Sequence, residues 1–247
     1  MRGGLFGIIL YNMMNLVKYL SVCGAASRRR AEARIRAGSV AVDGVVETDP
    51  ARKLAGNESV TLDGRELRVP ERRHYILLHK PRGYVCSNSD AHAEHLALEL
   101  IDLPGVRLVS AGRLDKESEG AIVFSDDGEF VNRLAHPRYD VRKTYRVAVR
   151  PQLTPADRER ICSGIVDAGE TLRALAVREL ADGEYEFVLN AGRKREIRRL
   201  VRACGAAVTR LVRTQIGPVT LAGLASGRWR ELAPAEVAGL LGKEAGS

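Results

Sequence analysis

An aspartate near the middle of the chain, Asp115, has the surroundings of a reactive carboxylate. It stands in VSAGRLDKESEGAIVF, between a strand-like run and a polar turn, where an isolated aspartate is ordinarily a turn residue. Arg113 lies two residues before it, so in an extended segment both side chains project to the same side. Ala111 and Gly112 leave no bulky neighbour. The segment therefore indicates a carboxylate beside a cation, open to a large ligand.

A second segment, RKTYRVAV at residues 142–149, reads as a strand with Lys143, Tyr145 and Val147 on one face. A lone tyrosine on a strand usually packs in the core.

The third segment is a run of cations over residues 193–213, with eight Lys or Arg and one acidic residue, Glu196. Four of these cations follow helical spacing and predict a basic stripe: Arg195, Arg198, Arg199 and Arg202. Such a stripe can be a solvated face. Because so many like charges repel one another, it can also be a surface that meets an anion.

Other kinds of site find little support. The sequence has no Gly-x-Gly-x-x-Gly after a strand, no phosphate-binding loop before Gly242-Lys243, and no Gly-x-Ser-x-Gly. Cys86, His92 and His95 lie within ten residues, but no fourth ligand follows nearby, so we expect no metal site.

Composition favours a polyanionic partner. The 247 residues carry a formal net charge of +8 and 45% hydrophobic residues, an ordinary globular composition. Lys and Arg gain affinity for nucleic acid by displacing counterions from phosphates. The four cysteines are widely spaced, which indicates a reducing compartment, and we expect a cytoplasmic protein.

The elements that must position these residues form two domains. Residues 1–14 are expected to be an unstructured N-terminal extension, a translated leader with Met14 as a plausible initiator. It is too short for a membrane span, and we expect no membrane association. Residues 15–70 predict a small α+β domain of two helices, the second capped by Ser27, followed by hairpins. Asp43-Gly44 and Asp63-Gly64 each predict a tight hairpin turn.

Residues 71–247 predict an α+β domain on a mainly antiparallel sheet with flanking helices. Thr154-Pro155 opens one helix, and residues 195–204 form another. Seven strands are predicted, at residues 75–78, 84–87, 108–111, 121–124, 144–149, 185–189 and 208–212.

Taken together and in order, three segments resemble one family. GRLDKESEGAIVFSDDGEF, HPRYDVRKTYRV and GRKREIRRLVRACG are similar to the RsuA-type pseudouridine synthases, which include RluB and RluF. VKYLSVCGAASRRRAEARIRAGSVAVDG resembles the small RNA-binding domain of ribosomal protein S4. The resemblance covers roughly residues 15–233. It implies isomerisation of a uridine in ribosomal RNA without a cofactor, with the large-subunit RNA slightly favoured.

The resemblance also implies roles for single residues. Asp115 corresponds to the catalytic aspartate, Tyr145 to the tyrosine that stacks on the target base, and Arg198 to the arginine that pairs with the carboxylate. Arg113 corresponds to an arginine that contacts RNA beside the extruded base. The remaining cations that we expect to bind RNA are Arg28, Arg29, Arg30, Arg34, Lys143 and Arg195.

Two positions depart from the family pattern. Glu196 replaces a more common Gln, which places an additional negative charge near the site. Ser118 replaces Thr and keeps the hydroxyl.

The implied chemistry requires a flipped base, a stacking ring and an ionised carboxylate. The carboxylate could attack the sugar, attack uracil or remove a sugar proton, and the sequence leaves these routes open. A non-catalytic RNA-binding or ribosome-assembly factor is the alternative, although such a protein has no need of a buried carboxylate. A DNA-binding protein that uses residues 28–36 would leave the second domain unexplained. We expect a monomer that acts on ribosomal RNA or a subunit precursor, and not on DNA.

Overall fold

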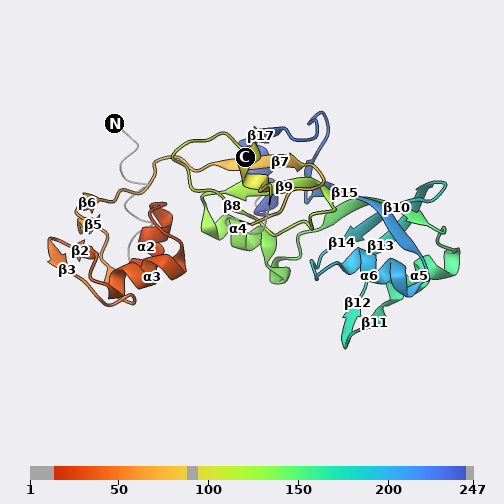
Figure 1. The fold of residues 1–247 in the computed structure, drawn as a ribbon, viewed down its shortest axis with the longest axis horizontal. Helices are drawn as coiled ribbons and strands as arrows, with labels where there is room; N and C mark the ends of the chain where they lie inside the picture. The colour runs from red at the N-terminus through yellow and green to blue at the C-terminus, as the bar shows by residue number, and fades with distance from the viewer. Residues whose placement is uncertain (1–13, 88–93, 243–247) are drawn as a thin grey trace. The chain divides into compact units, whose positions relative to one another are not determined.

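The computed structural model describes residues 14–87 and 94–242, and the chain divides into two compact units, residues 1–73 and 74–247 (Figure 1). Of the predicted extension, residues 1–13 lie outside the described residues. Met14 was placed wrongly in that extension. It is 8% exposed and pairs with Leu54, because the first unit needs its side chain in the core.

From residue 14 onward, where the structure describes it, the first unit contains two helices and six short strands. These are β1 (Met14–Asn15), α2 (Leu16–Val22), α3 (Arg28–Arg36), β2 (Val40–Val42), β3 (Val45–Val46), β4 (Lys53–Leu54), β5 (Val60–Leu62) and β6 (Arg65–Glu66). Strands β3, β2, β5 and β6 form an antiparallel sheet in that order, and β1 pairs with β4.

Local sequence explains these elements. Ser27 caps α3 by accepting a hydrogen bond from the Arg30 amide, as predicted. Both Asp-Gly pairs form two-residue turns with positive φ at each position, which Asp tolerates and Gly favours. Ala31 and Ile35 are fully buried, so the arginines of α3 remain on its outer face.

The second unit is built on a nine-stranded sheet. Its elements are β7 (Tyr75–Lys80), η1 (Ala97–Leu100), β8 (Val109–Ser110), β9 (Glu119–Ser125), α4 (Gly128–Ala135), η2 (Pro137–Tyr139), β10 (Lys143–Arg150), α5 (Pro155–Ser163), β11 (Ile165–Asp167), β12 (Glu170–Leu172), β13 (Ala176–Ala181), β14 (Glu184–Leu189), α6 (Glu196–Ala203), β15 (Ala207–Ile216), β16 (Val219–Thr220), β17 (Trp229–Glu231) and α7 (Pro234–Leu240).

The sheet runs β13-β14-β10-β15-β9-β7-β17, with β16 beside β15 and β8 beside β9. Among its pairs in the described residues, only β15–β9 is parallel. The predicted α+β architecture is therefore confirmed. Helix α5 begins at a Thr154 capping box, as predicted.

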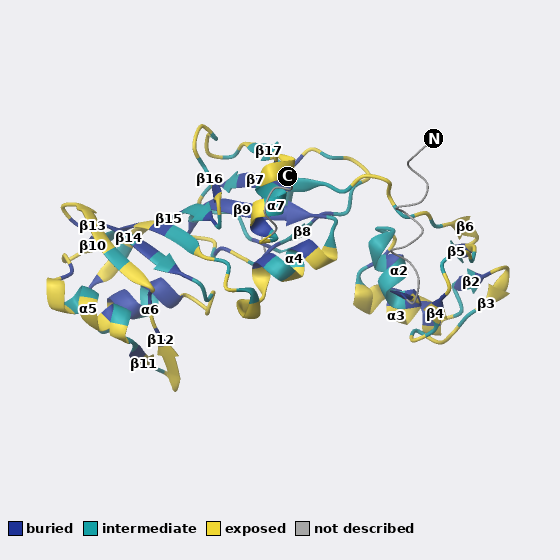
Figure 2. Cartoon of the chain, turned by 180° about the vertical axis from the view of Figure 1, so that it is seen from behind, coloured by how far each residue is buried: buried dark blue, intermediate teal, exposed yellow. Residues whose placement is uncertain are grey.

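Hydrophobic cores lie on both faces of this sheet. Ile76 and Ile122 contribute to one core, whereas Leu77 and Ala121, the adjacent residues on β7 and β9, contribute to the other. Figure 2 shows buried segments of β7 and β9 in dark blue. The sheet is thus a buried layer, and a charged side chain that points from it into a core is unusual and requires an explanation.

One predicted strand is wrong. Residues 84–87 make a single parallel bridge, Val85 with Leu96, and no extended ladder. The partner segment enters η1 one residue later, so the pairing cannot continue. No described helix is long and apolar enough to cross a membrane.

Candidate active site

Asp115 lies in the loop that joins β8 to β9, and backbone hydrogen bonds fix this loop. The Ser118 amide donates to the Asp115 carbonyl at 3.0 Å, and the Gly83 amide donates to the Lys116 carbonyl at 2.8 Å. The Leu114 amide donates to the Cys86 sulfur at 3.4 Å. The Asp115 side chain is partly buried and has no hydrogen-bond or ion-pair partner among residues 14–87 and 94–242. The backbone of this loop is therefore fixed, whereas the Asp115 carboxylate has no bonding partner among the described residues.

Tyr145 lies on β10 opposite Phe187 of β14 and Arg213 of β15. It is 8% exposed and packs in the same core cluster as Leu114, the neighbour of Asp115. Lys143 is half-buried two residues earlier on the strand. Burial, followed by the charge of Arg213, lowers the pKa of Lys143 to about 8.

Arg198 on α6 contacts the Asp115 loop, but through the backbone. Its Nη2 donates to the Glu117 carbonyl at 3.3 Å and its Nη1 to the Val208 carbonyl at 3.3 Å. Burial lowers the pKa of Arg198, and the charge of Asp115 acts in the opposite direction. The direct ion pair implied by the resemblance is not formed in this structure, because the guanidinium is engaged by two carbonyls. The two charges remain close enough to interact.

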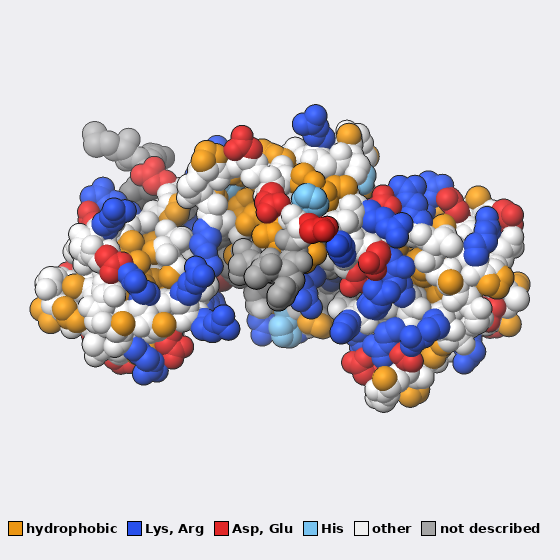
Figure 3. All heavy atoms as spheres, viewed as in Figure 1, with side chains coloured by type: hydrophobic (Ala, Val, Ile, Leu, Met, Phe, Trp, Pro, Cys, Tyr) orange, Lys and Arg blue, Asp and Glu red, His pale blue; other side chains and the backbone are white. Residues whose placement is uncertain are grey.

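Several predicted cations have acidic partners instead of free charges. Arg199 pairs with Asp167 and Glu170, and Arg202 also pairs with Asp167. Arg195 adopts a left-handed conformation before α6 and pairs weakly with Glu117 at 3.4 Å. The predicted basic stripe is therefore corrected, since acidic residues of β11 and β12 neutralise much of it. Figure 3 shows red side chains among the blue ones over this part of the unit.

The Glu196 carboxylate is buried and has a hydrogen-bond partner. It is 6% exposed and accepts the Arg193 amide at 3.1 Å. Burial raises its pKa, whereas the hydrogen bond from the Arg193 backbone and the charge of Arg193 act in the opposite direction.

The cations of α3 and of the Asp115 loop remain exposed. Arg113, Arg28, Arg29 and Arg30 have no acidic partner among the described residues, whereas Arg34 pairs with Asp63.

Two buried cations were missed by sequence reasoning, Lys80 and Arg213. Lys80 is fully buried, and its Nζ donates to the Pro81 and Tyr84 carbonyls, each at 2.9 Å. Burial lowers the Lys80 pKa and the charge of Arg213 adds to this effect, whereas Cys86, Glu119 and Asp115 act in the opposite direction. Neither cation forms an ion pair with a carboxylate in the described parts of the chain.

Arg213 is 4% exposed, and its Nε donates to the Ala121 carbonyl at 2.6 Å. Gly120 is a sequence signal that could have pointed to the position of Arg213, because a glycine inside a strand often marks the close approach of another backbone. A Cβ at Gly120 would lie 2.2 Å from the Arg213 carbonyl oxygen.

Unsatisfied polar atoms gather at the same place. In the described residues, three buried side-chain atoms have no hydrogen-bond partner: Ser118 Oγ, Arg198 Nε and Arg213 Nη2. Buried polar groups are normally hydrogen-bonded, so these atoms require an explanation. Ser118 lies in the Asp115 loop, Arg198 contacts that loop, and Arg213 lies opposite Tyr145.

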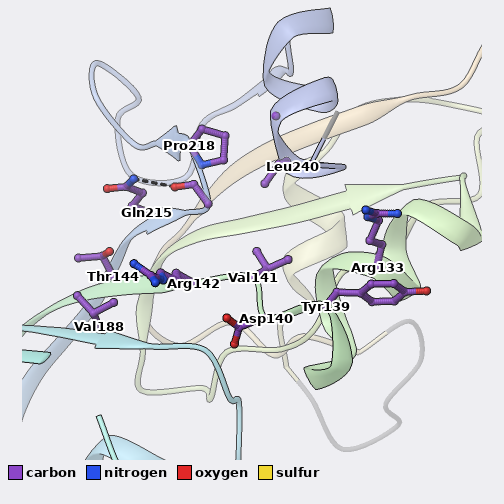
Figure 4. Close-up of a pocket in the computed structure, with 13 residues that line it drawn as sticks. Arg133, Tyr139, Asp140, Val141, Arg142, Thr144, Val188, Gln215, Pro218 and Leu240 are labelled. Carbon is purple, nitrogen blue, oxygen red and sulfur yellow. Dashed lines mark hydrogen bonds between the residues drawn. The ribbon is translucent and has the colours of Figure 1, made fainter. Parts of the chain in front are cut away.

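A separate cavity of about 530 Å³ lies between α4, the start of β10 and α7. Figure 4 shows Arg133, Tyr139 and Arg142 around it and the hydrogen bond from Gln215 to the Gly217 carbonyl. Thr144 lines this cavity, and neither Tyr145 nor Asp115 does. Since neighbouring residues of a strand point to opposite faces, this cavity is distinct from the candidate site. No group of three metal-binding side chains occurs within the described ranges, which exclude His92.

The comparison with known families decides between an enzyme and a binding module. The family of RNA pseudouridylate synthases matches residues 74–203, a range that includes Asp115, Tyr145 and Arg198. The chain belongs to this family. It is therefore an RNA pseudouridine synthase, an isomerase. The S4 domain matches residues 14–60, so this synthase also carries the expected RNA-binding domain.

Relatives extend over nearly the whole length of this pseudouridine synthase. The Bacillus subtilis (strain 168) ribosomal large subunit pseudouridine synthase B is 32% identical, covering 91% of this chain and 94% of the relative. The Escherichia coli (strain K12) ribosomal small subunit pseudouridine synthase A is also 32% identical, covering 92% and 100%. A crystal structure of a pseudouridylate synthase superposes with a TM-score of 0.68 at 27% identity, covering 92% of this chain and 99% of that one.

Proposed function

We propose that this enzyme isomerises one uridine of ribosomal RNA to pseudouridine, with Asp115 as the catalytic carboxylate and the large-subunit RNA as its substrate. Support comes from relatives named for ribosomal RNA. Both large-subunit and small-subunit enzymes occur among them at similar identity. The choice of the large subunit follows from the overall likeness of the motifs to RluB-type members.

The observation that carries the proposal is the state of the Asp115 side chain. Its carboxylate is partly buried, fixed by its loop, and unpaired, whereas Lys80, Arg198 and Arg213 supply positive charge from the surrounding elements. The ionised carboxylate is the form needed for attack or proton removal.

The other predicted residues complete the site. The Tyr145 ring stacks on the flipped uracil and replaces part of the stacking lost from the RNA. Arg198 acts near the carboxylate through charge, while Arg113, Lys143 and Arg195 contact the RNA around the target. In the S4 domain, Arg28, Arg29, Arg30 and Arg34 bind phosphates, which position the RNA without reading its sequence.

The reaction itself is balanced without a co-reactant. The bond between the sugar C1′ and uracil N1 breaks, uracil turns, and a bond forms between C1′ and C5, while the proton lost from C5 is replaced by one at N1. We therefore propose that no cofactor is required. Attack on the sugar, attack on uracil and removal of a sugar proton all remain available to Asp115. We further propose a cytoplasmic monomer that does not act on DNA.

The direct test is to map pseudouridine in ribosomal RNA from cells with and without the gene. We expect one large-subunit pseudouridine to disappear and to return with the wild-type gene but not with Asp115→Asn. Loss of a small-subunit pseudouridine would overturn the choice of subunit. No change in any ribosomal RNA, together with inactive purified enzyme, would overturn the proposed function.

A further inference from the structure

Arg213 has a hydrogen-bond donor that nothing in the described protein uses. The side chain is 4% exposed, the Nε is satisfied by the Ala121 carbonyl, and the Nη2 is buried with no partner. A guanidinium stays charged at any physiological pH, so it cannot reduce the cost of burial by losing its proton. Leaving a buried charged donor unsatisfied is strongly unfavourable, which points to an acceptor that arrives from outside.

The position of Arg213 identifies where that acceptor would lie. In the antiparallel pair of β10 and β15, Arg213 is directly opposite Tyr145, and both are buried on the same face. Gly120 lets β9 and β15 approach closely, which fixes the backbone of Arg213 beside the end of the Asp115 loop. A base stacked on Tyr145 would present its edge, and not its phosphate, to a buried neighbour on this face.

We propose that Arg213 is a substrate-binding residue of the isomerisation site, whose Nη2 donates to a carbonyl oxygen of the flipped uracil. This inference rests on the proposed function and adds a contact to the base. Ser118 Oγ and Arg198 Nε are the other two buried side-chain atoms without a partner in the described residues; Ser118 belongs to the Asp115 loop and Arg198 contacts it.

The contact strengthens as the reaction proceeds. When the C1′–N1 bond breaks, its electron pair remains on uracil, and the negative charge spreads to the carbonyl oxygens. If Asp115 attacks uracil first, negative charge again collects on a carbonyl oxygen. A fixed cationic donor therefore stabilises the charged intermediate more than the neutral base, and so raises kcat more than affinity. Lys80, also buried and without a carboxylate partner, adds to the same positive potential.

The test combines a protein change with a change of one substrate atom. The full-length enzyme and its Arg213→Gln variant are assayed on the ribosomal RNA segment that the wild type modifies, made with uridine, 2-thiouridine or 4-thiouridine at the target. Sulfur accepts hydrogen bonds weakly, so one thio substitution removes the acceptor. We expect Arg213→Gln to lower kcat on normal RNA by about 100-fold, as for loss of one preorganised donor, with little change in KM.

The decisive result is non-additivity. The wild type should be slowed by one thiouridine, and Arg213→Gln should be slowed little further by the same atom, because the contact is already lost. Equal slowing of both enzymes by both thiouridines would overturn the inference. A phosphorothioate next to the target could instead abolish the difference in rate between the wild type and Arg213→Gln. That result would assign Arg213 to a phosphate and would also overturn the inference.

Two controls separate this result from misfolding and from the proposed function. Arg213→Lys keeps the charge but loses the second donor arm, and it should show the same loss of discrimination even if Arg213→Gln fails to fold. Arg210→Gln, on the same strand but exposed and paired with Glu119, should retain wild-type discrimination. No turnover by the wild type on any RNA would overturn the proposed function as well, whereas turnover with additive losses overturns this inference alone.

Discussion

Arg198 and Arg199 are adjacent on α6, yet their surroundings differ in kind. Arg199 meets two carboxylates, Asp167 and Glu170, on the β11–β12 hairpin. Arg198 turns toward the Asp115 loop, and its partners within the described parts of the chain are backbone carbonyls. The positive charge of a guanidinium paired with carboxylates is largely neutralised by its partners. A guanidinium that donates to neutral carbonyls keeps a net positive charge that can act on a substrate. The difference in partners supports the proposal that Arg198, and not Arg199, acts near the reacting carboxylate.

Replacing the two kinds of arginine should therefore have unequal effects. Arg198→Met is expected to lower the rate of pseudouridine formation by about 100- to 1,000-fold, the range for loss of one electrostatic donor at a reacting site. Arg202→Met, whose partner Asp167 also pairs with Arg199, should stay within about threefold of wild type. Single-turnover rates on ribosomal RNA measure both, and equal losses would erase the distinction between the two groups.

Tyr145 extends the comparison from charge to stacking. Tyr145→Phe keeps the ring face and should bind and react nearly as wild type does. Tyr145→Ala should lose roughly 1–3 kcal/mol of base stacking, which corresponds to about 5- to 150-fold in RNA affinity. Titration of labelled RNA measures the affinity. If both variants behave as wild type, Tyr145 is a packing residue of the core and the site must be placed elsewhere.

The arginines of α3 sharpen the comparison between free and paired cations. Arg28, Arg29 and Arg30 are exposed and have no acidic partner in the part of the chain that the structure describes, so replacing all three by Ala should weaken RNA binding by about tenfold at low salt. The slope of log affinity against log salt should become shallower by about 0.7–0.9 for each lost phosphate contact. An unchanged slope would show that α3 does not touch the RNA.

Lys143 gives the smallest effect, one that depends on pH. Its pKa of about 8 means that it is charged at pH 7 and largely neutral at pH 9. If it contacts a phosphate, RNA affinity should fall severalfold as pH rises through 8, and Lys143→Arg should flatten that dependence. The pH dependence of protein stability runs in the opposite direction to that of RNA affinity. Between pH 8 and 10.5 the unfolded chain binds more protons than the folded chain, so the free energy of unfolding rises with pH across that range. Identical pH profiles for both enzymes would exclude Lys143 from binding.

Local chemistry explains what could be predicted from the sequence. The Asp43-Gly44 turn and the Thr154 helix cap follow from contacts within a few residues, and both are present as predicted. The loop position of Asp115 likewise follows from its flanking strands.

Long-range partners explain what could not be predicted. Asp167 lies more than 30 residues from Arg199 on a three-residue strand too short to show a period, so the neutralised stripe was missed. Lys80 and Arg213 are buried against the normal preference of charged residues for solvent. The burial of Lys80 follows from tertiary contacts alone, and for Arg213 the sequence offers the strand glycine Gly120 as a signal.

The most direct test of the account is the conversion of uridine in ribosomal RNA by purified wild-type and Asp115→Asn enzyme, with RNA binding and thermal melting measured on the same preparations. Asparagine preserves the size of the side chain but can act neither as nucleophile nor as base. We expect pseudouridine formation to fall to background, RNA binding to remain equal or improve, and the melting temperature to change little, because the Asp115 carboxylate has no hydrogen-bond or ion-pair partner to lose among the described residues. Activity of Asp115→Asn within tenfold of wild type would contradict the central role of this carboxylate.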